Sequence, residues 1–188
     1  MSNYKNQPVR KYTDDLASRL PAPGGGSSAA LTAALGASLI SMVVNFTLGN
    51  AKYARYEKDL KATLEKSERL RQEFLNLVDL DVVAYSSKNL RDALGVPFMV
   101  ARLCFEGANI AFPLIKKGNS NLITDVVIAV ILLESAFVSA RFNVDINLKA
   151  LKDKNLAVSF KKELARKERL IKKIRTKTEE KVGAFIRG

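Results

Sequence analysis

The sequence feature that most constrains the fold is an uncharged stretch that runs from Leu20 to Ala51. It opens with the motif Pro21-Ala-Pro-Gly-Gly-Gly-Ser27, whose prolines and glycines end a preceding helix and whose serine can cap the next one. The residues that follow predict a helix over about Ser27 to Leu48. Small residues recur in it at intervals of four, at Ala29, Ala33, Ala37 and Ser41. A helix with such a face can approach its neighbours closely, so we expect it to lie at the centre of the fold.

About 20 apolar residues suffice to cross a bilayer, so a membrane span is the alternative for this helix. Serines, threonines and Asn45 dilute its hydrophobicity, and we expect no second span of this length. The sequence therefore favours a central core helix and no membrane partner. The same row of small residues could also form the seam of a dimer.

The rest of the chain predicts further helices, because apolar residues recur at helical spacing among charged ones. Their expected ranges are Tyr12–Leu20 (with Thr13 as N-cap), Tyr56–Tyr85, Pro97–Lys117, Leu122–Leu151 and Asn155–Ile186. Pro113 should kink or end the helix that contains it, and residues 89–96 form an irregular or helical link. A chain of 188 residues suits one domain, residues 1–188. We predict an all-α, single-domain, up-and-down bundle with a central small-residue helix and a long basic C-terminal helix.

The composition excludes several kinds of chemistry. The chain has no histidine and one cysteine, Cys104, so Ser-His-Asp and Cys-His catalysis and an intrachain disulfide are excluded. A zinc site built on His or Cys is nearly excluded as well, and we expect no metal. The polar segment Met1–Gln7 does not resemble a secretory signal, so a cytoplasmic location is expected.

The chain carries a formal net charge of +12, which favours acidic partners. Residues 152–188 hold 13 Lys and Arg against 5 Asp and Glu. A helical protein that binds nucleic acid through this basic helix is therefore one candidate. No known reading motif occurs and aromatic residues are not interleaved with the basic ones, so a nucleic-acid partner is not the expected one.

Two groups of polar residues depart from their local surroundings. Gly24, Gly25, Gly26 and Ser27 precede an uncharged helix, where free N–H groups and the positive end of the helix dipole could bind an anion or a carbonyl group. A plain tight turn is the alternative. Asn143 and Asn147 lie four apart on one face of a predicted core helix, so their amides should bond either a ligand or neighbouring backbone.

An up-and-down topology would bring these groups together. The second and fifth helices are then antiparallel, which places the glycines at the same end as Asn143 and Asn147. The third helix returns to that end with Asp81 and Tyr85. Asp125 is expected roughly 27 Å from Asn143 along its helix, at the opposite end with Asn45. Either Asp125 caps its helix, or a dimer carries it into the site of the second copy.

Four segments resemble a known family in their order and separation over about Leu16 to Asp153. They are Pro21-Ala-Pro-Gly-Gly-Gly-Ser27, Met42-Val-Val-Asn45-Phe-Thr47, Asp81-Val-Val-Ala84-Tyr85, and Asn121-Leu-Ile-Thr124-Asp125 leading to Asn143-Val-Asp-Ile-Asn147-Leu148. The chain resembles the cyclodeaminase/cyclohydrolase family of folate one-carbon enzymes. That family includes the cyclodeaminase half of formiminotransferase-cyclodeaminase and stand-alone methenyltetrahydrofolate cyclohydrolases. The segment from Tyr85 to Val96 is shorter here than in most members.

The resemblance implies an all-helical, homodimer-forming domain that binds tetrahydrofolate derivatives, with Asp81 as the catalytic aspartate. A carboxylate suits this chemistry, because the methenyl carbon is cationic and is attacked by water. Tyr85 would assist proton transfer. The expected substrate-binding residues are Gly24, Gly25, Gly26, Ser27, Asn45, Asp125, Asn143 and Asn147.

The expected activity is methenyltetrahydrofolate cyclohydrolase, a hydrolase that needs no cofactor beyond its tetrahydrofolate substrate. The first alternative is formiminotetrahydrofolate cyclodeaminase, a lyase that releases ammonia. The alternative from another class is a non-catalytic folate-binding protein or the basic nucleic-acid-binding protein described above.

Overall fold

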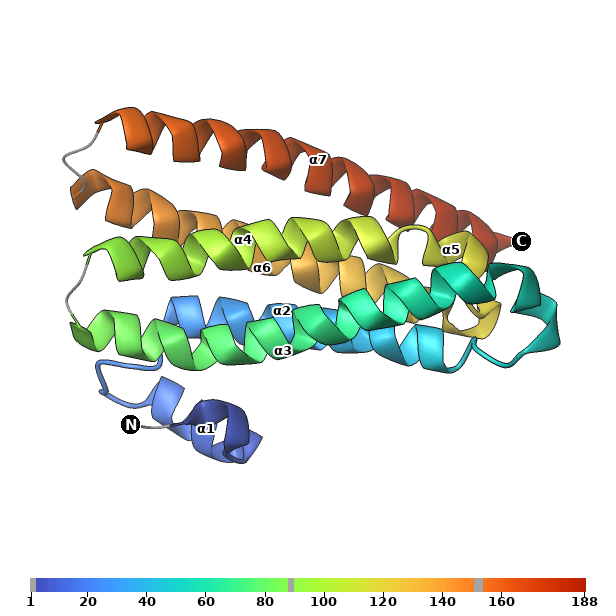
Figure 1. Ribbon diagram of the computed structural model, residues 1–188, viewed down its shortest axis with the longest axis horizontal. Helices are drawn as coiled ribbons and strands as arrows, with labels where there is room; N and C mark the ends of the chain where they lie inside the picture. The colour runs from blue at the N-terminus through green and yellow to red at the C-terminus, as the bar shows by residue number, and fades with distance from the viewer. Residues whose placement is uncertain (1–2, 88–89, 151–153) are drawn as a thin grey trace.

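A computed structural model describes residues 3–87, 90–150 and 154–188 of the chain (Figure 1). Within these ranges every regular element is helical, so the prediction of an all-α bundle is confirmed. The helices are η1 (Tyr4–Asn6), α1 (Val9–Ala17), α2 (Gly25–Asn45), η2 (Ala51–Tyr56), α3 (Glu57–Ser87), α4 (Leu90–Ala111), α5 (Leu114–Lys117), η3 (Ser120–Leu122), α6 (Ile123–Ala150) and α7 (Lys154–Arg187). The five long helices run lengthwise beside one another, and α1 lies beneath one end of α2 and α3 (Figure 1).

Helix α2 is the central element that its small residues predict. It packs against α3, α6 and α4, and its alanines from Ala29 to Ala37 are buried. Gly36 marks the closest approach, because a Cβ at this position would lie 2.9 Å from Leu133 Cγ and 3.1 Å from the carbonyl oxygen of Ala129. The missing side chain therefore lets α2 and α6 pack closely side by side.

Two helix starts differ from their predictions by three residues or more. The first helix begins at Val9 rather than Tyr12, after Pro8, and Thr13 donates its hydroxyl to the backbone oxygens of Val9 and Arg10 instead of capping the helix. Helix α4 begins at Leu90, so Pro97 lies inside it rather than at its first position. Burial of residues on both sides of this proline, Leu94 and Val100, compensates for the hydrogen bond that proline cannot donate.

The remaining helix ends agree with the sequence to within a few residues. Helix α4 ends at Ala111, and a turn that contains Pro113 leads to the short α5, as predicted for this proline. The predicted link over residues 89–96 is helical from Leu90 onwards. Lys88 and Asn89 lie outside the described residues, as does Leu151.

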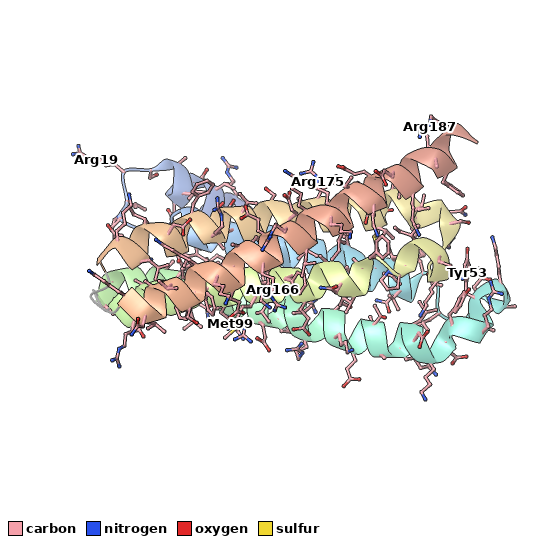
Figure 2. The ribbon with its side chains drawn as sticks, turned by 90° about the horizontal axis from the view of Figure 1, so that it is seen from above. Arg19, Tyr53, Met99, Arg166, Arg175 and Arg187 are labelled. Carbon is pink, nitrogen blue, oxygen red and sulfur yellow. The ribbon has the colours of Figure 1, made fainter. Side chains whose placement is uncertain are left out.

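The long basic helix α7 packs along α6 and α4. Its inner side buries Leu164, Ile171 and Val182, and Phe160 stacks on Phe98 with ring centroids 4.1 Å apart. Arg166, Arg175 and Arg187 are spread along its length (Figure 2). Arg175 donates to Glu134 of α6 over 2.9 Å, so part of the basic charge fastens the helix to the bundle.

The expectation that no second helix is as long and apolar as α2 is wrong. Three helical segments of the described chain are long and apolar enough to cross a membrane by length and composition: Gly25–Asn45, Arg91–Lys117 and Ser120–Ala150. In Gly25–Asn45, 61% of the most apolar 18-residue stretch is buried inside the protein. In Ser120–Ala150, only 39% of the corresponding stretch is buried. Packing within the bundle thus accounts for most of the apolar surface of α2 and leaves much of α6 exposed.

Candidate functional site

The predicted glycine end of α2 lines a pocket of about 300 Å³. Its walls come from the loop before α2, from the C-terminal part of α3, and from facing parts of α4 and α6. The lining residues are Pro21, Ala22, Gly24, Gly25, Gly26, Asp81, Ala84, Tyr85, Ala93, Pro97, Asn143, Ile146 and Asn147. The structure therefore brings together the glycines, the carboxylate, the phenol and the two amides, as the predicted topology requires.

The local sequence explains why backbone rather than side chains forms one wall. The loop contains a cis peptide bond between Ala22 and Pro23, and Gly24 is the extended N-cap residue of α2. The helix begins at Gly25, two residues earlier than predicted, so Gly25 and Gly26 lie in its first turn. Helix N–H groups in the first turn have no partner within the helix, so this turn presents backbone donors and the positive end of the dipole.

Glycine is required at position 26 because α3 approaches the start of α2 closely there. A Cβ at position 26 would lie 2.1 Å from Oδ1 of Asp81 and 2.7 Å from its Cγ. No side chain can occupy that space while Asp81 stays in place. The glycine therefore determines where the carboxylate of α3 lies relative to α2.

Asp81 is held at the N-terminus of α2 by one backbone hydrogen bond. The amide N–H of Ser27 donates to its Oδ2 over 2.8 Å. Burial raises the pKa of the Asp81 carboxyl, and the Ser27 hydrogen bond opposes this shift without cancelling it. A partly buried carboxyl with a raised pKa, located in a pocket, is suited to accept and return a proton.

The side chain of Ser27 lies away from the pocket, contrary to its predicted contact with substrate. Its hydroxyl donates to the backbone oxygen of Val78 in α3 over 3.0 Å and lies 3.2 Å from the hydroxyl of Tyr12. The residue is fully buried. Ser27 thus acts on the site through its amide, while its hydroxyl ties α2 to α3.

Sequence reasoning missed the part of the N-terminal segment that supports this arrangement. Tyr12 is buried and donates its hydroxyl to Ser27, and burial raises the pKa of Tyr12. Tyr4 packs edge-on against Tyr12, and its backbone N–H donates to Asp79 over 2.6 Å. The available signal was two tyrosines in an otherwise polar segment, whose burial requires a neighbour for the ring and a partner for the hydroxyl.

Asn143 and Asn147 both line the pocket, and both donate to backbone. The amide nitrogen of Asn143 bonds the Ser139 oxygen one turn earlier over 3.0 Å. That of Asn147 reaches the Ala93 oxygen of α4 over 2.6 Å. The backbone-bonding alternative is therefore confirmed for their NH₂ groups, and Asn147 also joins α6 to α4 at the pocket wall.

Asn45 and Asp125 are not part of this pocket. Asn45 ends α2 and Asp125 lies in the first turn of α6. These two helix ends lie at the end of the bundle opposite the start of α2 (Figure 1). A carboxylate in the first turn interacts favourably with the dipole of its own helix. Within one chain Asp125 thus lies in the first turn of α6 and outside the pocket, and its helix-capping role stays a prediction.

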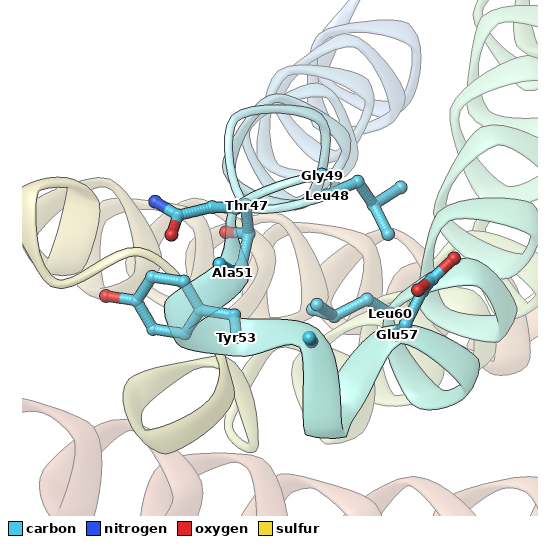
Figure 3. Close-up of a pocket in the computed structure, with 9 residues that line it drawn as sticks. Thr47, Leu48, Gly49, Ala51, Tyr53, Glu57 and Leu60 are labelled. Atoms are coloured by element: carbon cyan, nitrogen blue, oxygen red, sulfur yellow. The ribbon is translucent and has the colours of Figure 1, made fainter.

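A smaller cavity of about 100 Å³ lies at that opposite end, between the end of α2 and η2 (Figure 3). The polar groups of Tyr53 and Thr47 in this cavity are already hydrogen-bonded to a surrounding loop. The Ser120 amide donates to the hydroxyl of Tyr53, and the Asn119 amide donates to Oγ1 of Thr47, each over 2.9 Å. We assign this cavity to loop packing rather than to substrate.

The chain is similar in sequence and in fold to known proteins. The sequence model of the family described as Formiminotransferase-cyclodeaminase matches residues 8–88 and 86–166. A methenyltetrahydrofolate cyclohydrolase of Methylorubrum extorquens is 37% identical over 182 residues, which cover 85% of this chain and 88% of that protein. The formimidoyltransferase-cyclodeaminase of Rattus norvegicus is 29% identical over 168 residues, which are 77% of this chain but only 31% of that longer protein.

Among solved structures, a formiminotetrahydrofolate cyclodeaminase of Thermotoga maritima superposes with a TM-score of 0.93 at 26% identity. The match covers 97% of this chain and 99% of that one. The short connection between α3 and α4 therefore does not reflect the loss of a large segment relative to that protein.

Proposed function

The chain belongs to the formiminotransferase-cyclodeaminase family, and on this basis we propose that it is a folate one-carbon enzyme, a methenyltetrahydrofolate cyclohydrolase. The observation that carries the proposal is the partly buried carboxyl of Asp81, held by the Ser27 amide at the start of α2 in a pocket of about 300 Å³. The Methylorubrum relative supports the choice of reaction, since its similarity covers most of both chains.

The proposed reaction opens the bridge between N5 and N10 of 5,10-methenyltetrahydrofolate. The oxygen of a water molecule attacks the cationic bridging carbon while the Asp81 carboxylate accepts a proton from that water. The C–N5 bond of the resulting adduct then breaks, and Asp81 returns the proton to N5. The hydroxyl proton of the adduct leaves to solvent, which gives 10-formyltetrahydrofolate and one released proton.

The remaining pocket residues would bind and orient the substrate. The first-turn amides of α2 supply donors for carbonyl or anionic groups. Asn143 and Asn147 offer their amide oxygens to N–H groups of the substrate. Tyr85 lines the pocket and is exposed, so its hydroxyl can take part in proton transfer to solvent.

The second candidate is formiminotetrahydrofolate cyclodeaminase, a lyase, which the Thermotoga and Rattus relatives favour by their names. The same carboxyl would then protonate the departing ammonia. Purified protein should accelerate the loss of the near-ultraviolet absorbance of methenyltetrahydrofolate and should release no more ammonia from formiminotetrahydrofolate than buffer does. Ammonia release without accelerated opening of the methenyl bridge would assign the second reaction instead.

The proposal also covers the oligomeric state, the cellular location and the partners of the protein. We propose a homodimer in the cytoplasm, with no membrane partner and no cofactor beyond the folate substrate. A nucleic-acid-binding role is less well supported, because α7 uses part of its charge in ion pairs with Glu134 and Glu163. Binding to DNA or RNA that falls steeply with salt, without folate affinity, would favour that role.

A further inference from the structure

Pro97 leaves one backbone carbonyl of the pocket wall without its helical donor. In an α-helix the N–H of each residue donates to the carbonyl oxygen four positions earlier, which for position 97 is the oxygen of Ala93. Proline has no N–H, and Pro97 lies buried inside α4. The Ala93 oxygen therefore needs a donor from outside its own helix, because a backbone carbonyl that is removed from water is costly to leave unpaired.

The side chain of Asn147 supplies that donor. Its Nδ2 donates to the Ala93 oxygen over 2.6 Å, across the contact between α6 and α4. Ala93, Pro97 and Asn147 all line the pocket that contains Asp81. The interior proline of α4 thus lies at the point where a side chain of the candidate site replaces the missing backbone N–H.

This hydrogen bond decides which atom of the Asn147 amide is available to a ligand. An amide side chain has a donor end and an acceptor end, and a carbonyl oxygen can bind only the donor end. With Nδ2 bound to Ala93, Oδ1 is the atom that remains. No residue within the described ranges donates to this oxygen, and Asn147 is only partly buried. The pocket therefore offers a hydrogen-bond acceptor at this position.

Asn143 shows what the proline adds. Its Nδ2 donates to the Ser139 oxygen over 3.0 Å, and the backbone N–H of Asn143 reaches the same oxygen within α6. That carbonyl stays paired if the Asn143 side chain turns away. The Ala93 oxygen has no second donor of this kind, so rotation of Asn147 would leave it unpaired. The amide of Asn147 is thus held more firmly than that of Asn143.

We propose that Pro97 is a positioning residue for substrate binding, which fixes Asn147 as a hydrogen-bond acceptor for an N–H group of the reduced pterin. This inference rests on the proposed function for the identity of the ligand. A reduced pterin carries N–H and NH₂ donors on its ring, so an acceptor of fixed orientation selects it over a ring that presents a lone pair there. Such a ring would place two acceptors against each other and leave both unpaired.

Pro97→Ala is the direct test. Alanine restores the N–H at position 97 and is favoured over proline inside a helix, so the variant should melt no lower than the wild type. Ala93 no longer needs Asn147, whose amide can then turn. KM for methenyltetrahydrofolate should rise about 3- to 10-fold, the value of one hydrogen bond, with little change in kcat. The matched control is Pro113→Ala, outside the pocket at the N-cap of α5, which should leave KM unchanged.

Asn147→Leu shows whether the effect of Pro97 passes through Asn147. This variant keeps the approximate size of the side chain and removes both amide atoms, so KM should rise at least as much as in Pro97→Ala. In a Pro97→Ala background the same change should raise KM little further, because the oriented acceptor is already lost. Additive effects on KM would show that Pro97 acts on the substrate by another route and would overturn the inference.

The link between Pro97 and Asn147 can be measured without any folate. Asn147→Leu leaves the Ala93 oxygen without a donor, so it should lower the melting temperature of the otherwise wild-type protein. In Pro97→Ala the backbone N–H at position 97 takes over this oxygen, and the same change should cost about half as much or less. The NH₂ protons of Asn147 should also exchange with solvent more slowly than those of Asn143 in the wild-type protein.

The outcomes separate this inference from the proposed reaction. Equal losses of melting temperature in both backgrounds, or faster exchange at Asn147 than at Asn143, would contradict the link. Coupled melting temperatures with an unchanged KM in Pro97→Ala would show a structural contact that orients no substrate acceptor. If the wild type acts on no folate, the proposed function fails together with the pterin as ligand, and the melting temperatures still decide whether Pro97 fixes Asn147.

Discussion

Asp81→Asn should lower kcat/KM for opening of the methenyl bridge by about 10²- to 10⁴-fold, the usual contribution of a general base. Asparagine has the same shape and can still accept the hydrogen bond from the Ser27 amide, so the pocket should persist without its proton acceptor. The measurement is the initial rate of absorbance loss at several methenyltetrahydrofolate concentrations. The matched control is Asp79→Asn on the same helix, whose side-chain oxygen accepts from the Tyr4 amide outside the pocket.

Stability measurements show whether Asp81→Asn loses activity because the proton acceptor is missing or because the protein unfolds. Burial raises the pKa of Asp81 above its unfolded value, so the stability linked to its protonation is present at low pH and is lost as pH rises through the folded pKa. The asparagine of Asp81→Asn is neutral at every pH, so the variant does not lose this stability as pH rises. The variant should therefore melt at or above the wild-type temperature at pH 7, and the difference should shrink as pH falls through the raised pKa of Asp81 and vanish below the ordinary aspartate value of about 4. A variant that melts well below the wild type would attribute the lost activity to unfolding.

Gly26→Ala should abolish activity nearly as completely as removal of the carboxylate. The added methyl group would lie 2.1 Å from Oδ1 of Asp81, so Asp81 or the start of α2 must move. Alanine favours a helix over glycine by about 1 kcal/mol, but a collision between buried groups costs about 1–3 kcal/mol. We expect a lower melting temperature together with the loss of turnover.

Two further variants isolate the cause of this effect. Gly95→Ala, in α4, is the matched control because a Cβ there meets nothing within 4 Å, and it should keep the fold and the activity. In an Asp81→Ala background the cost of Gly26→Ala to stability should largely disappear, since the colliding atoms are gone. Equal costs in both backgrounds would show that the contact between Gly26 and Asp81 does not limit the substitution.

The sequence predicts the site well where the argument depends on chain topology. The uncharged stretch with small residues at intervals of four favours a position at the centre, and short connections then determine the directions of the neighbouring helices. This is why Asp81, Gly26 and Asn143 could be expected in one place although they are far apart in the chain. The length of α6 likewise predicts that Asp125 lies far from the pocket within one chain.

The predictions fail where tertiary packing outweighs local preference. Pro97 was expected to start a helix, but buried residues on both sides extend α4 through it. The orientation of the Ser27 hydroxyl depends on Tyr12 and on the backbone of Val78, and no local pattern specifies these partners. The apolar character of α6 was underestimated for a related reason, because part of its apolar surface is exposed rather than buried in the core.

The pH dependence of kcat/KM for methenyltetrahydrofolate, measured against the buffer-catalysed rate, tests the central claim most directly. A base must be ionised to accept a proton, and the pKa of Asp81 is raised by burial. We predict acceleration over buffer at neutral pH that declines on the acid side, with a midpoint above the ordinary aspartate value of about 4, and no such decline in the residual rate of Asp81→Asn. A rate equal to that of buffer at every pH, or an acid limb that persists unchanged in Asp81→Asn, would contradict the assignment of Asp81 as the catalytic base of this reaction.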